Sequence, residues 1–209
     1  MGQLEDYGVF ALASLALYRA TFDPGYLQEA IDRAMQMEAQ FLDQEHGGYF
    51  MTASHAERLI ARPKETYDGA IPSGNSVAAA VLQSLAALTA EPKWLDAAAQ
   101  QFRFLAGKIR ELPLGHSFAL LAMTDALYPG QELICVSREG LPDKLAAFLK
   151  TATADNVQVL LKTPENADAL CRYAPFTREY PLPEQGAVYY LCENGTCHAP
   201  TADFEALNL

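Results

Sequence analysis

The sequence predicts a mostly α-helical fold, a partial toroid of α-hairpins, followed by a small α/β subdomain. Helical segments that are apolar on nearly every face alternate with segments that carry a single apolar stripe. The alternation repeats once, at an interval of 68 residues from Pro24 to Pro92. After Pro129, short apolar runs typical of strands replace this pattern. We therefore expect two domains, the partial toroid at residues 1–129 and the α/β subdomain at residues 130–209.

Composition narrows the class of protein. The 209 residues include 26 acidic and 15 basic side chains, a net charge of −11, and half of them are apolar. Such a composition is typical of a folded globular chain, and the lack of a basic run argues against nucleic-acid binding. The sequence contains no apolar stretch of membrane-spanning length and no secretory leader at residues 1–8. We therefore expect a cytoplasmic protein with neither a nucleic-acid nor a membrane partner.

The first two helices are of different kinds. Residues 4–20 are apolar almost all round, which a helix tolerates only when it is covered on every side, so they predict an inner helix. Asp23 and Pro24 then supply an N-cap and a first-turn proline for a second helix. This second helix has one apolar stripe and one polar face, which indicates an outer position.

The same pair of helices recurs. Residues 73–90 are again nearly all apolar, and Glu91 and Pro92 start another striped helix. The superposition of the two pairs also matches Leu17 with Leu85, Thr21 with Thr89, Tyr26 with Trp94, Leu27 with Leu95 and Ala30 with Ala98. Residues 116–127 predict a third inner helix. Inner helices shielded by outer ones are what a toroid of hairpins needs, and a simple bundle is the alternative.

One connection is far longer than the others. Residues 43–72 join an outer helix to the next inner helix, whereas the links from inner to outer helices are minimal. Loops of this length are commonly functional. Within the loop, residues 47–52 and 58–62 predict the two limbs of a short hairpin.

The C-terminal part predicts three strands and a helix. The strand-like runs are residues 132–137, 157–161 and 187–192, and residues 141–150 form an amphipathic helix after the first of them. A strand, helix and strand in this order imply a parallel crossover. The first strand is not followed by a glycine-rich phosphate loop, so we expect no dinucleotide and no other cofactor.

Four stretches resemble a known family. They are residues 4–7 (LEDY), residues 43–50, the run RPK…DGAIPSGNS at residues 62–76 and the tail CENGTC…P at residues 192–200. Together they resemble the C-terminal part of the YyaL-type and spermatogenesis-associated thioredoxin-domain proteins. The resemblance implies a longer parent, with a thioredoxin-like domain before an (α/α)6 toroid similar to N-acylglucosamine 2-epimerases and six-hairpin glycosidases. The partners implied are the missing toroid half, the thioredoxin-like domain and a second copy across the exposed toroid edge.

The resemblance also implies a site, because the cavity of such toroids opens at the N-terminal ends of the inner helices. The candidate catalytic carboxylates are Glu5, Asp6 and Asp68. The candidate ligand-binding side chains are Tyr7, Arg62, Lys64, Ser73 and Asn75. Helix capping is the alternative role for Glu5, Asp6 and Ser73, and a structural salt bridge that pins the loop is the alternative for Arg62.

The leading hypothesis is a toroid that binds a sugar-like ligand, with glycosidase- or epimerase-like chemistry in the parent protein. An isolated fragment would be inactive, because half a ring cannot enclose substrate. Epimerases of the related fold use histidines, but His46 and His55 stand in no epimerase motif and are interpreted as surface residues. The alternative hypothesis is a non-catalytic recognition module that presents protein clients to a thioredoxin-like redox domain.

Two cysteines flank a hairpin signal in the tail. Asn194 and Gly195 predict a two-residue turn that would place Cys192 and Cys197 on opposed residues. Reduced structural cysteines are the favoured interpretation, and a redox couple in a disulfide and a zinc site are the alternatives. Zinc would need two more ligands, and Cys135, Cys171 and His198 have no diagnostic spacing, so we predict no metal.

Overall fold

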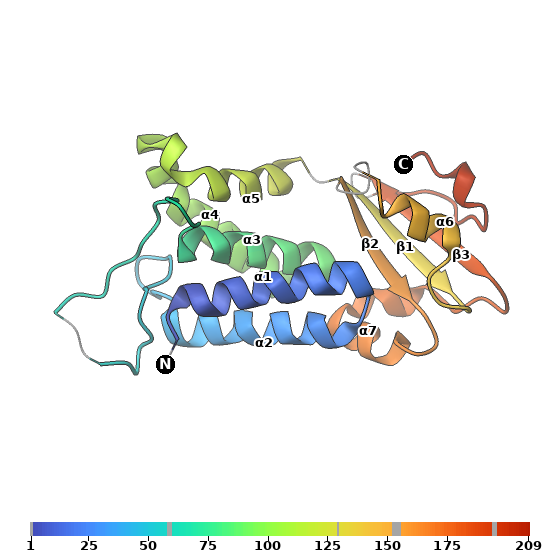
Figure 1. Cartoon of the computed structure of the whole chain (residues 1–209), viewed down its shortest axis with the longest axis horizontal. Helices are drawn as coiled ribbons and strands as arrows, with labels where there is room; N and C mark the ends of the chain where they lie inside the picture. The colour runs from blue at the N-terminus through green and yellow to red at the C-terminus, as the bar shows by residue number, and fades with distance from the viewer. Residues whose placement is uncertain (1, 58–59, 129, 152–155, 194–195) are drawn as a thin grey trace. The chain divides into compact units, whose positions relative to one another are not determined.

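A computed structural model of the chain describes residues 2–57, 60–128, 130–151, 156–193 and 196–209. The chain divides into two compact units, Met1–Leu127 and Tyr128–Leu209. The first unit is helical and the second combines helices with a four-stranded sheet (Figure 1). The predicted fold class, mostly α followed by a small α/β part, is therefore confirmed.

The helical unit consists of two hairpins and a further helix. Its elements are α1 (Leu4–Thr21), α2 (Pro24–Phe41), α3 (Gly74–Thr89), α4 (Pro92–Glu111) and α5 (Ser117–Leu127), the last preceded by a 3₁₀ turn at Pro113–His116. Helices α1, α3 and α5 form one row, in which α3 packs against both of the others. Helix α2 packs on α1, and α4 packs on α3. This is the predicted arrangement of inner helices with outer companions.

The 68-residue repeat is confirmed where each inner helix ends. The hydroxyl of Thr21 donates to the carbonyl four residues earlier at 2.8 Å, and the hydroxyl of Thr89 does the same at 2.7 Å. The next residues, Phe22 and Ala90, both cap their helices in the left-handed conformation, with φ of 56° and 53°. A proline at the first turn then starts each outer helix. Equivalent residues thus build equivalent turns.

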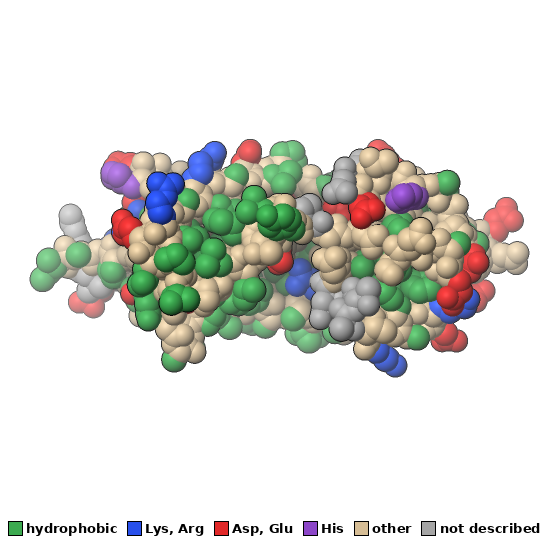
Figure 2. All heavy atoms as spheres, turned by 90° about the horizontal axis from the view of Figure 1, so that it is seen from above, with side chains coloured by type: hydrophobic (Ala, Val, Ile, Leu, Met, Phe, Trp, Pro, Cys, Tyr) green, Lys and Arg blue, Asp and Glu red, His purple; other side chains and the backbone are tan. Residues whose placement is uncertain are grey.

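Helix α3 is covered on nearly every side, as predicted, but α1 and α5 are not. Large apolar side chains on these two helices are about half exposed or more, from 45% for Leu17 to 67% for Leu127, namely Val9, Phe10, Leu17, Leu121 and Leu127. Hydrophobic side chains gather on the face of the helical unit that Figure 2 shows in its left half. The physical reason is position, because α3 has inner neighbours on both sides whereas α1 and α5 end the row.

The predicted hairpin in the long loop differs from the structure. Tyr49 forms an isolated antiparallel bridge with Leu42, and the Met51 N–H donates to the Pro63 carbonyl at 2.9 Å. The chain therefore folds back on itself, but among the described residues 47–57 and 60–62 it forms no strand ladder. Part of the second predicted limb, residues 58–59, lies outside the described residues.

The α/β unit contains a sheet with the strand order β2-β1-β3-β4. The strands are β1 (Gln131–Ser137), β2 (Val157–Lys162), β3 (Ala187–Glu193) and β4 (Thr196–Cys197). Strands β1 and β2 are parallel and are joined through α6 (Asp143–Phe148), which confirms the predicted crossover. Strand β3 runs antiparallel to both β1 and β4. The short β4 and the seven-residue α7 (Ala167–Tyr173) are elements that the sequence did not predict.

Within the described residues, no helix is both long and apolar enough to cross a bilayer.

Candidate functional site

The long loop covers one end of the helical unit. In Figure 1 it extends beyond the helix ends, on the side where α1 begins. The Leu4 N–H, at the start of α1, donates to the Met51 carbonyl of the loop at 3.0 Å. This end carries most of the residues that the sequence singled out, so each of them can be examined for the contacts it makes.

Asn75 holds the long loop to α3 through hydrogen bonds of its side chain. The residue is fully buried in the first turn of α3. Its Oδ1 accepts from the Tyr49 N–H at 2.8 Å and from Gln101 Nε2 at 3.1 Å. Its Nδ2 donates to the carbonyls of Tyr49 and Glu65, at 2.9 and 2.7 Å. An amide has two acceptor and two donor positions, and all four are used here, so Asn75 holds both limbs of the loop rather than a ligand.

Asp68 joins the loop to two helix starts. Its carboxylate is buried, with an exposed fraction of 8%. Oδ1 accepts from the Ser73 N–H at 2.9 Å, and Oδ2 accepts from the N–H groups of Phe118 at 2.8 Å and Ala119 at 3.4 Å. The negative charge therefore lies at the N-terminal end of α5, where the helix dipole favours it. The contacts of Asp68 are those of a cap.

Ser73 and Asp6 also serve as helix caps. The buried Ser73 is the N-cap of α3, and its Oγ accepts from the Ser76 N–H at 3.2 Å. The Oδ2 of Asp6 accepts from the Gln3 N–H at 2.7 Å, one turn back at the start of α1. Tyr7 is half-buried, and its ring packs 5.2 Å from the ring of Phe41. For Ser73 and Asp6 the contacts are those of helix caps, which is the alternative role given above.

Arg62 and Lys64 hold the loop internally. The Arg62 guanidinium lies over the Phe50 ring, 4.1 Å from its centroid, and donates to the Thr52 carbonyl at 2.6 Å. Among the described residues, Arg62 therefore holds the loop through a carbonyl and an aromatic ring, and not through the salt bridge that was its alternative role. Lys64 Nζ lies 2.5 Å from Asp43 Oδ2, and this bond holds the pKa of the Asp43 carboxyl well below its usual range.

Tyr49 fastens the loop to α2 as well as to α3. Its ring is fully buried, and its hydroxyl donates to the Glu38 carboxylate on α2. Burial raises the pKa of the Glu38 carboxyl. Burial also raises the pKa of the Tyr49 hydroxyl well above its usual value. His116, buried between Leu112 and Thr66, adds a fourth fastening that the sequence did not single out. The described part of the loop thus forms a rim that is held to α1, α2, α3 and α5 by hydrogen bonds.

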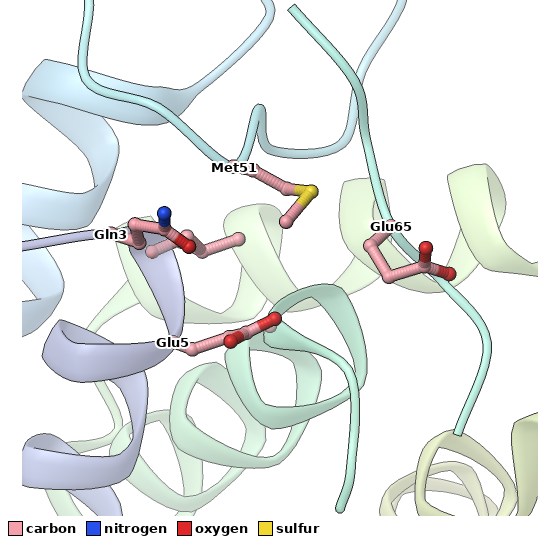
Figure 3. A pocket seen from close by; sticks show the side chains of 6 residues that line it. Gln3, Glu5, Met51 and Glu65 are labelled. Atoms are coloured by element: carbon pink, nitrogen blue, oxygen red, sulfur yellow. The ribbon is translucent and has the colours of Figure 1, made fainter. Parts of the chain in front are cut away.

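Two glutamates line a crevice inside this rim. The crevice has no room for a water molecule and is lined by Gln3, Leu4, Glu5, Met51, Glu65 and Gly74. Figure 3 shows Glu5 from the start of α1 and Glu65 from the loop on opposite sides of it, with Met51 above. Glu5 is half-buried and makes no hydrogen bond or ion pair with another described residue. Glu65 uses only Oε1, which accepts from the N–H groups of Thr66 and Tyr67.

Glu65 is therefore a candidate site residue that the sequence analysis missed. The signal that points to it is its place directly after Lys64 in the charged run of the loop. Of the three predicted catalytic carboxylates, only Glu5 remains free of backbone contacts, because Asp6 and Asp68 serve as caps.

A second concavity lies on the outer side of the rim. It encloses about 320 Å³ and is lined by Leu42, Asp43, Gln44, His46, Gly47, Gln100, Arg103 and Phe104. Gly48 allows the loop to approach Phe104 closely at this place, because φ there is +71° and an added Cβ would lie 2.4 Å from the Phe104 ring. The His46 side chain is 76% exposed and His55 is also exposed, in agreement with the surface positions expected for both.

Comparison with known proteins identifies relatives along the whole sequence. The chain is 30% identical to spermatogenesis-associated protein 20 of Homo sapiens and 30% identical to that of Rattus norvegicus, in alignments that cover 97% of this chain and 26% of each relative. The chain is homologous to one region of spermatogenesis-associated protein 20. An uncharacterized protein of Caenorhabditis elegans is 24% identical, over 97% of this chain and 27% of its own length. The chain matches no protein-family model.

The chain spans about a quarter of the length of spermatogenesis-associated protein 20. The expected similarity to the spermatogenesis-associated proteins is therefore confirmed. The alignment covers the loop, the inner-helix starts and the tail together, because it extends over nearly the whole of this chain.

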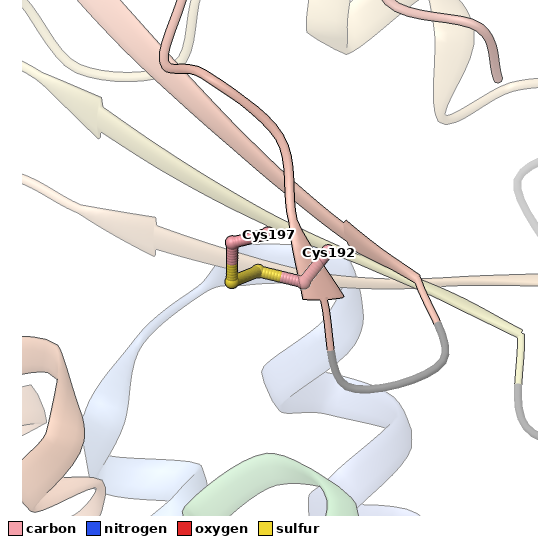
Figure 4. Close-up of a disulfide and its surroundings, with 2 residues drawn as sticks. All are labelled: Cys192 and Cys197. Atoms are coloured by element: carbon pink, nitrogen blue, oxygen red, sulfur yellow. A yellow bond between two sulfur atoms is a disulfide. The ribbon is translucent and has the colours of Figure 1, made fainter.

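The tail cysteines are bonded rather than reduced. Cys192 of β3 and Cys197 of β4 form a disulfide, with their Cα atoms 3.9 Å apart (Figure 4). This corrects the expectation of free thiols, and the reason is register, since the two residues are direct partners in the antiparallel ladder. The predicted turn at residues 194–195 lies outside the described residues. The described residues contain no group of His, Cys, Asp or Glu side chains arranged to hold a metal ion.

Proposed function

We propose that this chain forms part of an (α/α)6 toroid that binds a sugar-like, polyhydroxylated ligand at the N-terminal end of its inner helices. One observation carries the proposal. Glu5 and Glu65, from two different segments, line one crevice, while the polar side chains around them hold the rim to the helices. The Glu5 carboxylate and Oε2 of Glu65 remain available there, and such acceptors are suited to ordered hydroxyl groups.

Carboxylates fit this ligand class for two reasons. Ionised carboxylates accept hydrogen bonds from vicinal hydroxyls, and a carboxyl pair can supply the acid and the base of glycoside chemistry. Within the proposal Glu5 keeps its role as a candidate acid or base, and Glu65 takes the second position. Asp6 and Asp68 then act as positioning residues, because they hold the starts of α1 and α5.

The rest of the proposed ring would complete the site. The crevice has no room for a water molecule by itself, so a sugar would need a wall from further inner helices. The exposed apolar side chains of α1 and α5, such as Phe10 and Leu121, are where those helices would pack. In the isolated chain one of these two edges would be covered by a second copy, which is the homodimer expected from the sequence.

Sugar binding can be tested by NMR titration with glucose and N-acetylglucosamine on the full-length parent protein, which would supply the further inner helices of the ring. Backbone amides of residues 3–7, 49–51, 64–66 and 74–76 should shift with saturation. Glu5→Gln and Glu65→Gln should each weaken binding by about tenfold, as loss of one charged hydrogen-bonding group predicts. Glu57→Gln, an exposed carboxylate of the same loop, is the matched control. Shifts confined to Gln100 and Arg103, or no shifts at all, would contradict the proposal.

A second candidate function, recognition of protein clients for a thioredoxin-like redox domain, draws on a different observation. The loop exposes large apolar side chains that pack against little, with Ile60 fully exposed and Tyr67 and Ile71 more than half exposed. Such side chains are suited to unfolded polypeptide. Fluorescence anisotropy with reduced, carboxymethylated α-lactalbumin would separate the two functions. Ile60→Ser with Ile71→Ser should abolish client binding and leave the sugar titration unchanged, whereas Glu5→Gln should do the reverse.

A further inference from the structure

We propose that the disulfide between Cys192 and Cys197 is a reversible redox couple that exchanges two electrons with a dithiol. The proposal concerns the α/β unit alone and does not depend on sugar binding by the helical unit. It rests on three observations, namely the unequal exposure of the two cysteines, the contacts that hold both strands without the disulfide, and the isolation of the other thiols.

The two sulfurs differ in access. Cys197 lies on β4, a two-residue strand at the edge of the sheet, and is exposed together with the residues that follow it. Cys192 lies on β3, between β1 and β4, and is 6% exposed. An attacking thiolate must approach one sulfur along the axis of the disulfide bond. The Sγ of Cys197 is therefore the atom that a reductant reaches.

The exchange is balanced in two steps. The first thiolate of the dithiol attacks Cys197 Sγ, the bond between the two protein sulfurs breaks, and Cys192 leaves as a thiolate that takes up a proton. The second thiol of the reductant, after losing its proton, attacks the reductant's own sulfur in the mixed disulfide, and Cys197 leaves as a thiolate that is protonated. The reductant is oxidised to its disulfide, and the protein pair has gained two electrons and two protons.

Both cysteines stay in place when the bond is broken, because other contacts hold their strands. Strand β3 is paired with β1 along its length. After Cys197 the chain returns to β3 through the His198 N–H, which donates to the Leu191 carbonyl at 2.9 Å. Further along, Tyr189 and Thr201 exchange two backbone hydrogen bonds, at 2.8 and 3.1 Å. The reduced thiols therefore remain opposite each other, which favours re-formation of the bond through a high effective concentration.

The C-terminal segment has a further anchor beyond this ladder. The Phe204 ring packs 5.3 Å from the Tyr189 ring and 5.8 Å from the Phe148 ring, measured between centroids. The fold of the unit therefore does not depend on the disulfide, which is the condition for a couple that cycles in the native state.

The other two thiols do not compete with this pair. Cys135 is fully buried in β1, and burial raises the pKa of its thiol to about 12. Cys171 on α7 is half-buried and accepts a hydrogen bond from the Thr177 hydroxyl. A buried thiol with a raised pKa is a poor nucleophile. Exchange should therefore stay within the pair of Cys192 and Cys197.

The test is a redox titration of the folded chain with mixtures of reduced and oxidised dithiothreitol, followed by acid quench, alkylation and mass measurement. Two added alkyl groups should appear in one transition, at the same ratio from the oxidised and from the reduced side, while the circular dichroism spectrum stays constant. A bond that resists a large excess of reduced dithiothreitol until the protein unfolds would overturn the proposal. So would a reduced protein that fails to re-form the bond.

Two further comparisons test the mechanism. With glutathione at the same thiol concentration, the reduced fraction of the pair should be at least tenfold smaller than with dithiothreitol, because a monothiol cannot resolve its own mixed disulfide. Equal reduced fractions would contradict a dithiol partner. In Cys192→Ser the remaining Cys197 should react with dithionitrobenzoate at least tenfold faster than Cys192 does in Cys197→Ser. Equal rates would contradict the attack on Cys197, and Cys171→Ser, as control, should leave the titration unchanged.

Discussion

Asn75 binds both backbone groups of Tyr49, accepting from its N–H at 2.8 Å and donating to its carbonyl at 2.9 Å. The Asn75 amide thereby pairs with the backbone of Tyr49 as a neighbouring β-strand would, and it holds the long loop against the first turn of α3. Because the amide and its partners are buried, removal of Asn75 leaves donors and acceptors without water or protein partners.

Asn75→Ala should therefore lower the free energy of unfolding by about 2–4 kcal/mol, as the loss of several buried hydrogen bonds predicts. Urea denaturation followed by circular dichroism measures the change. Gln83→Ala, on the same helix and only half-buried, is the control and should cost less than about 1 kcal/mol. A similar cost for both variants would show that Asn75 does not fasten the loop.

Gly48→Ala should destabilise the chain by at least about 1–3 kcal/mol, because φ there is +71° and the new Cβ would overlap the Phe104 ring. Gly107→Ala is a matched control on α4, where an added Cβ meets nothing within 4 Å. That variant should stabilise the protein by about 0.5–1 kcal/mol, because alanine is the better helix former. Thermal and urea unfolding of the two variants should thus shift in opposite directions.

The ion pair of Lys64 with Asp43 should contribute to stability in a pH-dependent way. The hydrogen bond from Lys64 lowers the pKa of Asp43 in the folded state. The ion pair therefore stabilises the fold above the ordinary aspartate pKa of about 4, and this stabilisation is lost as the pH falls further. Lys64→Met should therefore destabilise the chain at pH 7. The difference in free energy of unfolding between this variant and the unmodified chain should shrink between about pH 4 and pH 2, because the Asp43 carboxylate is increasingly protonated there. A difference that is constant across this range would contradict the assignment.

The exposed edge of α1 and α5 should make the isolated chain associate. Light scattering should show a mass that rises with concentration, because Phe10 and Leu121 are 51% and 64% exposed on the inner row. Phe10→Ser combined with Leu121→Ser should shift the chain to a monomer. Met35→Ser, which removes a similarly exposed side chain from the outer helix α2, should leave the mass unchanged. A parent chain that stays monomeric at high concentration would refute the expectation.

Much of the fold could be predicted because it depends on local chemistry. Asp23 with Pro24, and Glu91 with Pro92, start the outer helices where the sequence places them, since capping and a fixed proline φ act within one turn. The burial of α1 and α5 could not be predicted in the same way. Their apolar composition indicates inner positions, but exposure depends on which neighbours are present, and this chain supplies those for α3 only.

The candidate site likewise has features that the sequence predicts and features that only the tertiary structure shows. The polar residues of the loop and of the helix starts are visible in the sequence, and Ser73 as a cap follows from its position alone. That the Asn75 amide has all four of its hydrogen-bonding positions used, that Asp68 binds two helix starts, that Glu5 and Glu65 line one crevice, and that the opposed residues Cys192 and Cys197 are bonded follow only from the folded chain. Each of these depends on contacts between segments distant in sequence or on strand register, and side-chain spacing along the chain specifies neither.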